Sequence, residues 1–259
     1  MRHIIRLTYI ALACLPLMGA DLAPTGTLRA TFLGNNPVQG TVDAKTGTVS
    51  GPVADIVKEL ARRSGVPYTI LPAANAKEVI DRLNSGAVDI GFLAQEAERA
   101  LQVDFSGPYL LMEVTYLLPA ASPIKTAADA DRTGMRIGAV DNQSPTTFLK
   151  DHLKNAKLIA FDAQPPYEDL LKKFAAGELN AFSGNRMRLM EAAASNPGLR
   201  VAQDDFAKME QNIIVKKGDV QKLKIIDGFL DEARASGFLR DSFDRAHLVG
   251  VEAPAPRKR

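Results

Sequence analysis

Helical and extended segments alternate along this chain of 259 residues, and the alternation constrains the fold more than any other feature. Apolar residues at helical spacing over 53–61 precede an apolar run at 68–71, and the same order recurs within 79–92. It returns much later, where Gly177 separates a helical pattern at 170–175 from a strand pattern at 179–182. Strands that alternate with helices predict a parallel-rich α/β sheet. Because the two halves follow one plan, we expect two similar α/β lobes with a cleft between them.

The first twenty residues have the layout of a secretory signal peptide. Arg2 and Arg6 precede an apolar run at 7–17, and small residues follow at Gly19 and Ala20. We therefore expect residues 1–20 to be removed and the protein to be periplasmic. The apolar run is too short for a transmembrane helix, and no later segment has the roughly 20 apolar residues that a span requires.

The chain has one cysteine, Cys14, which lies inside the expected signal peptide. The mature chain would then contain no disulfide. Lipid anchoring at Cys14 is an alternative, but Ala11-Leu12-Ala13 lacks the leading Leu usual before a lipid-modified cysteine. Cleavage after Ala20 is the favoured interpretation.

Charge in the mature chain is balanced, because two of the 32 basic residues lie in 1–20 and the remaining 30 match 30 acidic residues. Such a chain has no bulk basic field of the kind that binds nucleic acid, and we expect no nucleic-acid partner. The basic run at 257–259 follows a Pro-rich segment. We expect residues 251–259 to form a mobile C-terminal tail.

The most informative motif runs from Glu98 to Tyr109 and reads Glu-Arg-Ala-Leu-Gln-Val-Asp-Phe-Ser-Gly-Pro-Tyr. It resembles the first-lobe signature of the periplasmic solute-binding proteins of family 3, the amino-acid-binding proteins of ABC importers. Further similarity extends over 28–51, 83–109, 122–124 and 235–239. The resemblance implies the two-lobed α/β fold of type II periplasmic binding proteins, with a hinge between the lobes. Within the motif we expect a turn at Pro108, while Asp104 or Ser106 accepts hydrogen bonds from loop amides.

We place the lobe boundaries where the chain is expected to cross from one lobe to the other, near residues 116–121 and 212–215. Residues 21–118 and 215–250 would form the first lobe, and residues 119–214 the second. The last long helical pattern, at 220–236, is expected to return to the first lobe because relatives of this family do so. Two extended crossings would make a hinge.

The resemblance gives Arg99 the role of anchoring a ligand carboxylate. A guanidinium offers two parallel donors that match a carboxylate, which Lys would not reproduce. The alternative is a surface Arg paired with Glu96 or Asp104. The other candidate contacts in the same segment are Phe92, Ala94 and Gln95, although Phe92 is equally suited to the core.

On the second lobe, Ser144 and Pro145 fit the N-cap and first position of a helix. Free amides at a helix N-terminus favour an anion, and the family places a ligand contact there, so Gln143 and Ser144 are candidates. An ordinary helix cap is the alternative.

Asn185 stands where an amino-acid binder of this family usually has Asp, and Pro52-Val53 replaces the usual Phe-Asp. An Asp would offset a ligand ammonium, whereas Asn supplies only dipoles. Either neutral groups bind the ammonium, or the ligand has none. Asn35, Asn36 and Asn75 are further candidates for donors to ligand oxygens, with turn formation as the alternative.

These features predict an extracytoplasmic receptor of an ABC importer that binds a polar amino acid or a related small carboxylate by hinge closure. A membrane permease would be its partner, the protein would be a monomer, and no cofactor is implied. One alternative is an enzyme similar to cyclohexadienyl dehydratase on the same fold; another is a receptor that presents its ligand to a membrane sensor. His152 and His247 have no triad or metal-site pattern around them, so we expect no enzyme.

Overall fold

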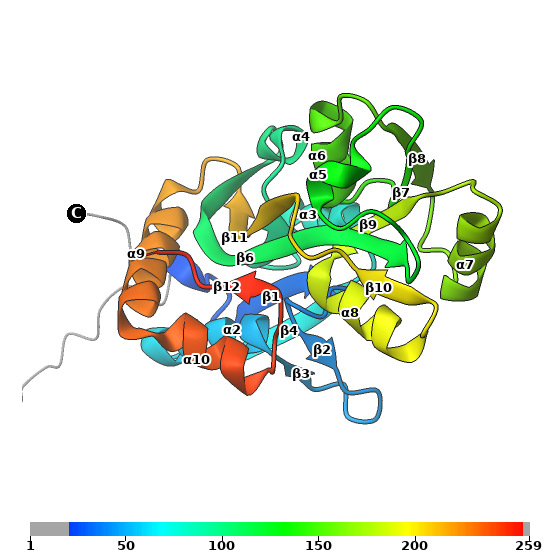
Figure 1. Ribbon diagram of the computed structural model, residues 1–259. Helices are drawn as coiled ribbons and strands as arrows, with labels where there is room; N and C mark the ends of the chain where they lie inside the picture. Colours follow the sequence, from blue (N-terminus) through cyan, green and yellow to red (C-terminus); the bar gives the residue numbers. More distant parts are fainter. Residues whose placement is uncertain (1–20, 256–259) are drawn as a thin grey trace, which may run out of the picture.

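The computed structural model describes residues 21–255, and one mixed sheet runs through this part of the protein (Figure 1). The strand order is β4-β1-β5-β11-β6-β9-β7-β8, with β10 and β12 also paired to β6, and β2 with β3 forms a separate small ribbon. The strands are β1 Leu28–Leu33, β2 Thr41–Val42, β3 Val49–Ser50, β4 Tyr68–Ala73, β5 Ile90–Ala94, β6 Val103–Pro119, β7 Arg136–Val140, β8 Lys157–Phe161, β9 Ala181–Asn185, β10 Leu199–Val201, β11 Ala207–Lys216 and β12 Val251–Glu252.

The helices flank this sheet in each half of the molecule. Where glycine ends a helix it adopts the left-handed conformation, as Gly65 does after α2 and Gly237 after α9, because this backbone conformation carries no steric cost for glycine. The helices are α2 Pro52–Ser64, α3 Ala76–Asn84, α4 Ala97–Ala100, α5 Ala127–Ala130, α6 Ser144–His152, α7 Tyr167–Ala175, α8 Arg186–Ser195, α9 Val220–Ser236 and α10 Phe238–Arg245.

Two lobes divide the sheet, as the alternation of patterns predicted. Parallel strands β4, β1 and β5 form one half, and parallel strands β8, β7 and β9 form the other. Each half has its own apolar cores, one group around Phe32 and Leu60, the other around Ile137 and Phe182. The two-lobed α/β arrangement that the resemblance implied is present.

Two long antiparallel strands, β6 and β11, connect the lobes. β11 pairs with β5 of the first lobe and with β6, whose distal part pairs with β9 of the second lobe. The two crossings are thus neighbours in one sheet rather than separate extended linkers. The residue bounds assigned to the lobes remain a prediction.

The motif at 98–109 differs from the expectation in one respect, because Pro108 lies inside β6 and not in a turn. The β6–β11 register shifts on both sides of Asn212, which is opposite Pro108. Proline lacks an amide donor and is tolerated in a strand at such an irregularity. Asp104 makes the expected loop contact by accepting a hydrogen bond from the Gly218 amide at 2.8 Å, whereas Ser106 accepts one from the amide of Ile213 within β11 at 3.0 Å.

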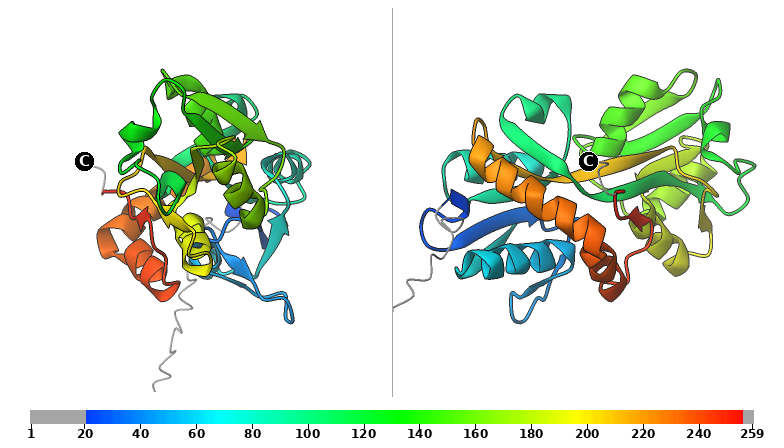
Figure 2. Two further views of the ribbon diagram at one scale, coloured as in Figure 1. Left: turned by 45° about the vertical axis from the view of Figure 1, so that its right-hand side comes forward. Right: turned by 90° about the vertical axis from the view of Figure 1, so that its left-hand side faces the viewer.

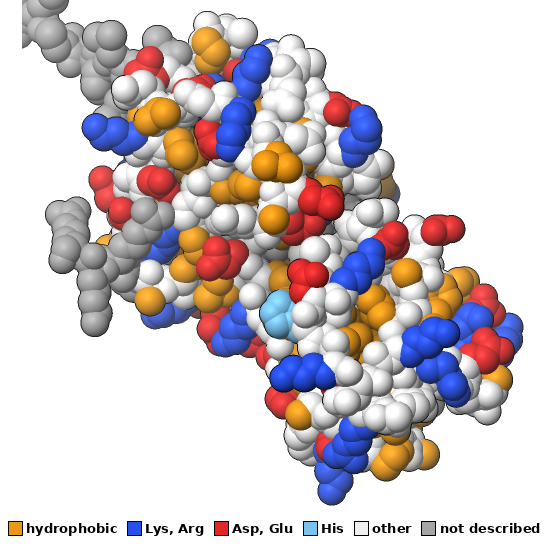
Figure 3. Space-filling model, turned by 90° about the horizontal axis from the view of Figure 1, so that it is seen from above, with side chains coloured by type: hydrophobic (Ala, Val, Ile, Leu, Met, Phe, Trp, Pro, Cys, Tyr) orange, Lys and Arg blue, Asp and Glu red, His pale blue; other side chains and the backbone are white. Residues whose placement is uncertain are grey.

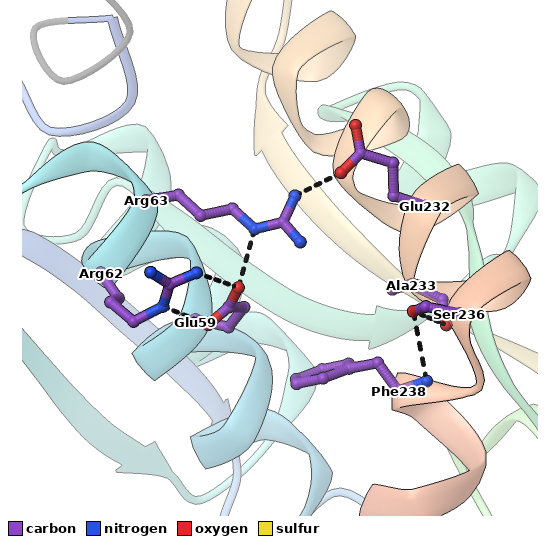
Figure 4. A network of polar contacts seen from close by, with 7 residues as sticks. All are labelled: Glu59, Arg62, Arg63, Glu232, Ala233, Ser236 and Phe238. Carbon is purple, nitrogen blue, oxygen red and sulfur yellow. Dashed lines mark hydrogen bonds and ion pairs between the residues drawn. The ribbon is translucent and has the colours of Figure 1, made fainter. Parts of the chain in front are cut away.

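The last long helix, α9, packs on the first lobe, and Figure 2 shows it lying along the strands there. Phe229 and Leu230 enter the core of that lobe. A polar network on the surface ties α9 to α2 (Figure 4): Glu59 accepts from Arg62 and Arg63, and Arg63 also donates to Glu232. Segments about 170 residues apart in the sequence are therefore joined side by side.

The two ends of the chain bear on earlier expectations. The signal peptide expected at 1–20 lies outside the described residues, as does the basic run at 257–259. Val251–Glu252 were expected to be part of a mobile tail, but they form β12 against β6, and Glu252 pairs with Lys208. Within residues 21–255, none of the helices combines the length and apolar character needed to cross a membrane.

Candidate functional site

Strand directions bring the carboxyl ends of the two parallel half-sheets toward each other. β5 is antiparallel to β11, β11 is antiparallel to β6, and β6 is antiparallel to β9. It follows that β5 and β9 run in opposite directions, each ending toward the other lobe. Ligands of open α/β sheets bind beyond the carboxyl ends of the strands, so the candidate site lies between these ends.

The register on β6 gives the scale of this site. Ala94, the last residue of β5, is opposite Gln211, which is opposite Leu110 on β6. Asn185, the last residue of β9, is opposite Val114. The two positions are four residues apart along β6, about 13 Å in the strand direction, and β11 and β6 also separate β5 from β9 across the sheet. This register gives the extent of the candidate site along the strands only.

The predicted site residues follow the strand ends that surround this space. Asn35 and Asn36 follow β1, Asn75 follows β4, and Gln95 to Arg99 follow β5. On the second lobe, Gln143 and Ser144 follow β7, and Asn185 ends β9. The topology therefore brings to one region segments that lie far apart in the sequence.

Arg99, on the short helix α4, is not a solvated surface residue, because only 11% of its side chain is exposed. Its Nη1 donates to the backbone oxygen of Ala94 at 3.0 Å, and its Nη2 lies 3.1 Å from Glu96 Oε1. Burial lowers the pKa of Arg99, while Glu96 and Glu98 act in the opposite direction. Arg99 thus pairs with Glu96, as the alternative to ligand contact predicted, but the pair is buried. Asp104 pairs instead with Lys217.

Glu96 was not among the predicted site residues, although only 15% of its side chain is exposed. Its Oε1 is buried and makes no hydrogen bond to any described residue; the approach to Arg99 Nη2 is close but out of alignment. Burial raises the pKa of Glu96, and Arg99 opposes this effect. Its position three residues before Arg99 was the one sequence signal for the pairing, and it did not indicate burial.

The helix that starts beyond β7 begins one residue earlier than expected. Gln143 is the N-cap of α6, without a side-chain capping bond, and Ser144 is the first helical residue. The chain turns toward the helix at Asn142, whose positive φ of 58° is a conformation that Asn tolerates. Thr146 supplies the local side-chain bond by donating to the Val140 oxygen. Ser144 is therefore not the cap, and its hydroxyl remains a candidate ligand contact.

Asn185 caps α8, since its Oδ1 accepts a hydrogen bond from the Arg188 amide at 2.8 Å. In this arrangement its oxygen is engaged locally and its side chain adds no charge to the site. Next to it, Arg188 Nη2 donates to the backbone oxygen of Asn35 at 3.3 Å, and Met187 packs against the core of the first lobe. The N-terminus of α8 is thus a point where the two lobes touch.

Three other candidates have local roles. Phe92 is fully buried and meets Tyr109 edge-on, with ring centroids 5.5 Å apart, which favours the core alternative. Asn75 caps α3 by accepting from the Glu78 amide at 2.9 Å. Asn36 differs, because its Oδ1 is buried without a hydrogen-bond partner among the described residues.

A buried glutamine pair that the sequence did not indicate connects the first loop to the hinge strand. Gln39 Nε2 donates to Gln211 Oε1 at 2.9 Å, while Gln39 Oε1 accepts from the Leu33 amide at 3.0 Å. Both side chains are almost completely buried. Since Gln211 is opposite Ala94, the pair fixes the loop after β1 beside the end of β5.

Other kinds of site find little support in the described part of the chain. Residues 21–255 contain no cluster of three or more His, Cys, Asp or Glu side chains placed to hold a metal ion. His152 stacks on Phe148, with centroids 3.9 Å apart. On the face shown in Figure 3, basic and acidic side chains are interspersed, so this face offers no continuous basic surface for nucleic acid.

Comparisons with known proteins agree with this geometry. The family model of the bacterial extracellular solute-binding proteins, family 3, matches residues 28–246. The L-cystine-binding protein TcyJ of Escherichia coli strain K12 is 24% identical over 200 residues, which cover 75% of this chain and 73% of TcyJ.

Two solved structures have the same fold. AbpA from Streptococcus pneumoniae, an amino acid ABC transporter substrate-binding protein bound to L-arginine, has a TM-score of 0.67 and 19% identity over 87% of this chain and 96% of AbpA. The ancestral amino acid-binding protein AncCDT-1, a precursor of cyclohexadienyl dehydratase, has a TM-score of 0.67 and 22% identity over 88% of this chain and 97% of its own.

Proposed function

The chain belongs to the bacterial extracellular solute-binding proteins of family 3, and from this premise we propose that it is the receptor of an ABC importer for an amino acid or related small carboxylate. The observation that carries the proposal is the largely buried Arg99, held at the carboxyl end of β5 by its hydrogen bond to the Ala94 oxygen, in a sheet where β9 of the second lobe ends toward β5. Support comes from TcyJ, which is named for L-cystine, and from AbpA, which is bound to L-arginine. The permease partner and the monomeric state are part of the proposal.

The proposed mechanism is hinge closure around the ligand. Arg99 would bind the ligand carboxylate on the first lobe through charge-assisted hydrogen bonds, after which the second lobe closes over it. The N-terminus of α6, next to Gln143 and Ser144, presents free amides and the positive end of a helix dipole to the same anion. Binding energy that is larger in the closed form shifts the population from open to closed.

The location and the absence of catalysis belong to the same proposal. A signal peptide at 1–20 would direct the protein to the periplasm, where the permease is accessible. Expression of the full chain in a Gram-negative host followed by osmotic shock tests this: we expect the protein in the shock fluid, and retention in the cytoplasmic or membrane fraction would contradict it.

One observation favours a second candidate, an enzyme similar to cyclohexadienyl dehydratase. AncCDT-1 shares the fold and is a precursor of that enzyme, and Glu96, whose pKa is raised, lies beside Arg99 in the candidate site. The test is incubation of the protein with chorismate-derived cyclohexadienyl acids while aromatic product is followed by absorbance. We expect no turnover above that of heat-inactivated protein.

A thermal-shift screen tests the principal proposal. The purified protein, dialysed free of ligand, is melted with the L-amino acids, L-cystine, 2-oxo acids and dicarboxylates, each at millimolar concentration. A ligand at 100 times its Kd stabilises the folded state by about 2.7 kcal/mol, which raises Tm by several degrees. We expect at least one small carboxylate to do so. A melting temperature unchanged by every compound would contradict the proposed function.

A further inference from the structure

Glu96 and Arg99 make an unusual pair for a site that is proposed to receive a carboxylate. Both side chains are largely buried, at 15% and 11% exposure, and Glu96 Oε1 has no hydrogen bond among the described residues. A buried carboxylate oxygen without a hydrogen bond costs free energy. The structure therefore places a carboxylate near the carboxyl end of β5 whose Oε1 is 3.1 Å from Arg99 Nη2 but accepts no aligned hydrogen bond.

The charges around this oxygen favour a ligand that carries a cationic group. Glu96 and Glu98 are acidic, Arg99 is the basic group beside them, and the electrostatic effect of Glu98 reaches both members of the pair. Across the site, Asn185 adds no charge, and its oxygen is occupied by the Arg188 amide. Adding a simple anion here would bury a second negative group beside Glu96, whereas a zwitterion brings one charge of each sign.

We propose that Glu96 determines the ligand class by receiving the cationic ammonium of a zwitterionic amino acid whose carboxylate is bound by Arg99. This inference rests on the proposed function and deepens it. The negative charge that Asn185 lacks on the second lobe is then present on the first lobe, three residues before the carboxylate anchor. An ammonium presents three donors, so one of them can donate to Oε1, which is ion-paired with Arg99 but accepts no hydrogen bond, and the others remain for neutral partners.

The raised pKa of Glu96 agrees with this role. Burial disfavours its ionised form, and Arg99 alone does not restore the ordinary pKa. A ligand ammonium close to the carboxylate would lower the pKa of Glu96 by a direct opposite charge. The same acid without its amino group would give no such compensation.

The experiment compares two ligands that differ only in the amino group. The amino acid that raises Tm most in the screen and the 2-hydroxy acid with the same side chain are titrated calorimetrically into wild type, Glu96→Gln and Glu168→Gln. Glu168→Gln is the control, because it removes the same charge from an exposed position on α7, away from the Glu96–Arg99 pair.

We expect the amino acid to bind wild type at least tenfold more tightly than the hydroxy acid. Glu96→Gln should lower the affinity for the amino acid about 10- to 100-fold, which is the range that loss of a charge-assisted hydrogen bond produces. It should leave the affinity for the hydroxy acid within about threefold of the wild-type value or raise it. Glu168→Gln should keep the affinity for the amino acid within about threefold of the wild-type value.

Other outcomes overturn the inference in distinguishable ways. If Glu96→Gln weakens both ligands equally, Glu96 merely positions Arg99. If the hydroxy acid binds wild type as tightly as the amino acid, Glu96 does not select for an ammonium, although the carboxylate receptor stands. If neither the amino acids nor the other acids bind wild type, the proposed function fails together with the inference.

Discussion

Arg99 and Glu96 concentrate the chemistry of the candidate site in two side chains separated by one helical turn. The motif at 98–109 made Arg99 a candidate ligand contact, because a motif is defined by residues that are neighbours in the sequence. The burial of Glu96 could not be predicted in the same way, since it depends on packing that forms only when distant strands assemble around the end of β5. Fully buried Phe92 illustrates the same limit: sequence allowed a wall or a core role, and packing favours the core.

We predict that replacing Arg99 by Lys weakens ligand binding. Lys keeps the positive charge beside Glu96 but cannot form two parallel hydrogen bonds with a carboxylate. Affinity for the ligand found in the screen should fall about 10- to 100-fold in a calorimetric titration, while Tm changes little. Arg132→Lys, at an exposed position outside the site, is the control and should bind as wild type does. Wild-type affinity in Arg99→Lys would remove Arg99 from the site.

Glu96 should also make the stability of the folded protein depend on pH. Because the pKa of Glu96 is raised in the folded state above its ordinary value of 4.5, the folded protein favours the protonated carboxyl. Its ionisation on raising the pH therefore costs stability, and the cost accumulates from pH 4.5 up to the raised pKa. Glu96→Gln does not titrate, so its unfolding free energy relative to wild type should increase over this window in the absence of ligand. Denaturant unfolding at a series of pH values measures it; a difference that is constant with pH would contradict the raised pKa.

Among the elements, β6 and α8 do most to build the site. The continuity of β6 through Pro108 was missed because the register shift that tolerates this proline involves Asn212, more than 100 residues later. The cap of α8 by Asn185 is local, yet the role of Asn185 beyond capping depends on how the second lobe faces the first. Local sequence patterns predicted the order of the helices and strands. They did not predict the pairing of β6 with β11, because those residues are about 100 positions apart in the sequence.

The polar contact between α2 and α9 should contribute a pH-dependent part of the stability through Glu59. Hydrogen bonds from Arg62 and Arg63 lower the pKa of Glu59 to about 2. The stabilisation is present above the ordinary pKa of 4.5 and is lost as pH falls toward 2. Because Arg62 is mostly exposed, we expect Glu59→Gln to cost about 1 kcal/mol of unfolding free energy at pH 7, less in high salt.

Glu232→Gln is the matched control for Glu59→Gln, since Glu232 meets Arg63 from a more exposed position. Urea unfolding of wild type and both variants at pH 7 and at lower pH measures the two costs, and Glu232→Gln should cost less unfolding free energy than Glu59→Gln. Equal costs at pH 7, or a cost for Glu59→Gln that persists at pH 2, would show that the network acts through packing rather than charge.

For the whole molecule, the main expectation is a change in shape upon binding. The lobes touch where Arg188 meets Asn35, and β6 and β11 are the strands about which we expect them to bend. Adding the ligand from the screen should reduce the radius of gyration in small-angle X-ray scattering, because ligand selects the closed population. Arg99→Lys at the same ligand concentration should give a smaller decrease. An unchanged radius in wild type at saturating ligand would exclude hinge closure as the mode of binding.

The strand order of the sheet also limits how early each lobe can fold while the chain is synthesised from its N-terminus. β11 lies between β5 and β6, so the edge of β5 stays unpaired until residues 207–216 have been made, after the whole second lobe. The first lobe further awaits α9 and α10 to cover its core. The lobe that is synthesised first is therefore completed last, because its sheet and its core both need segments that follow the second lobe in the sequence.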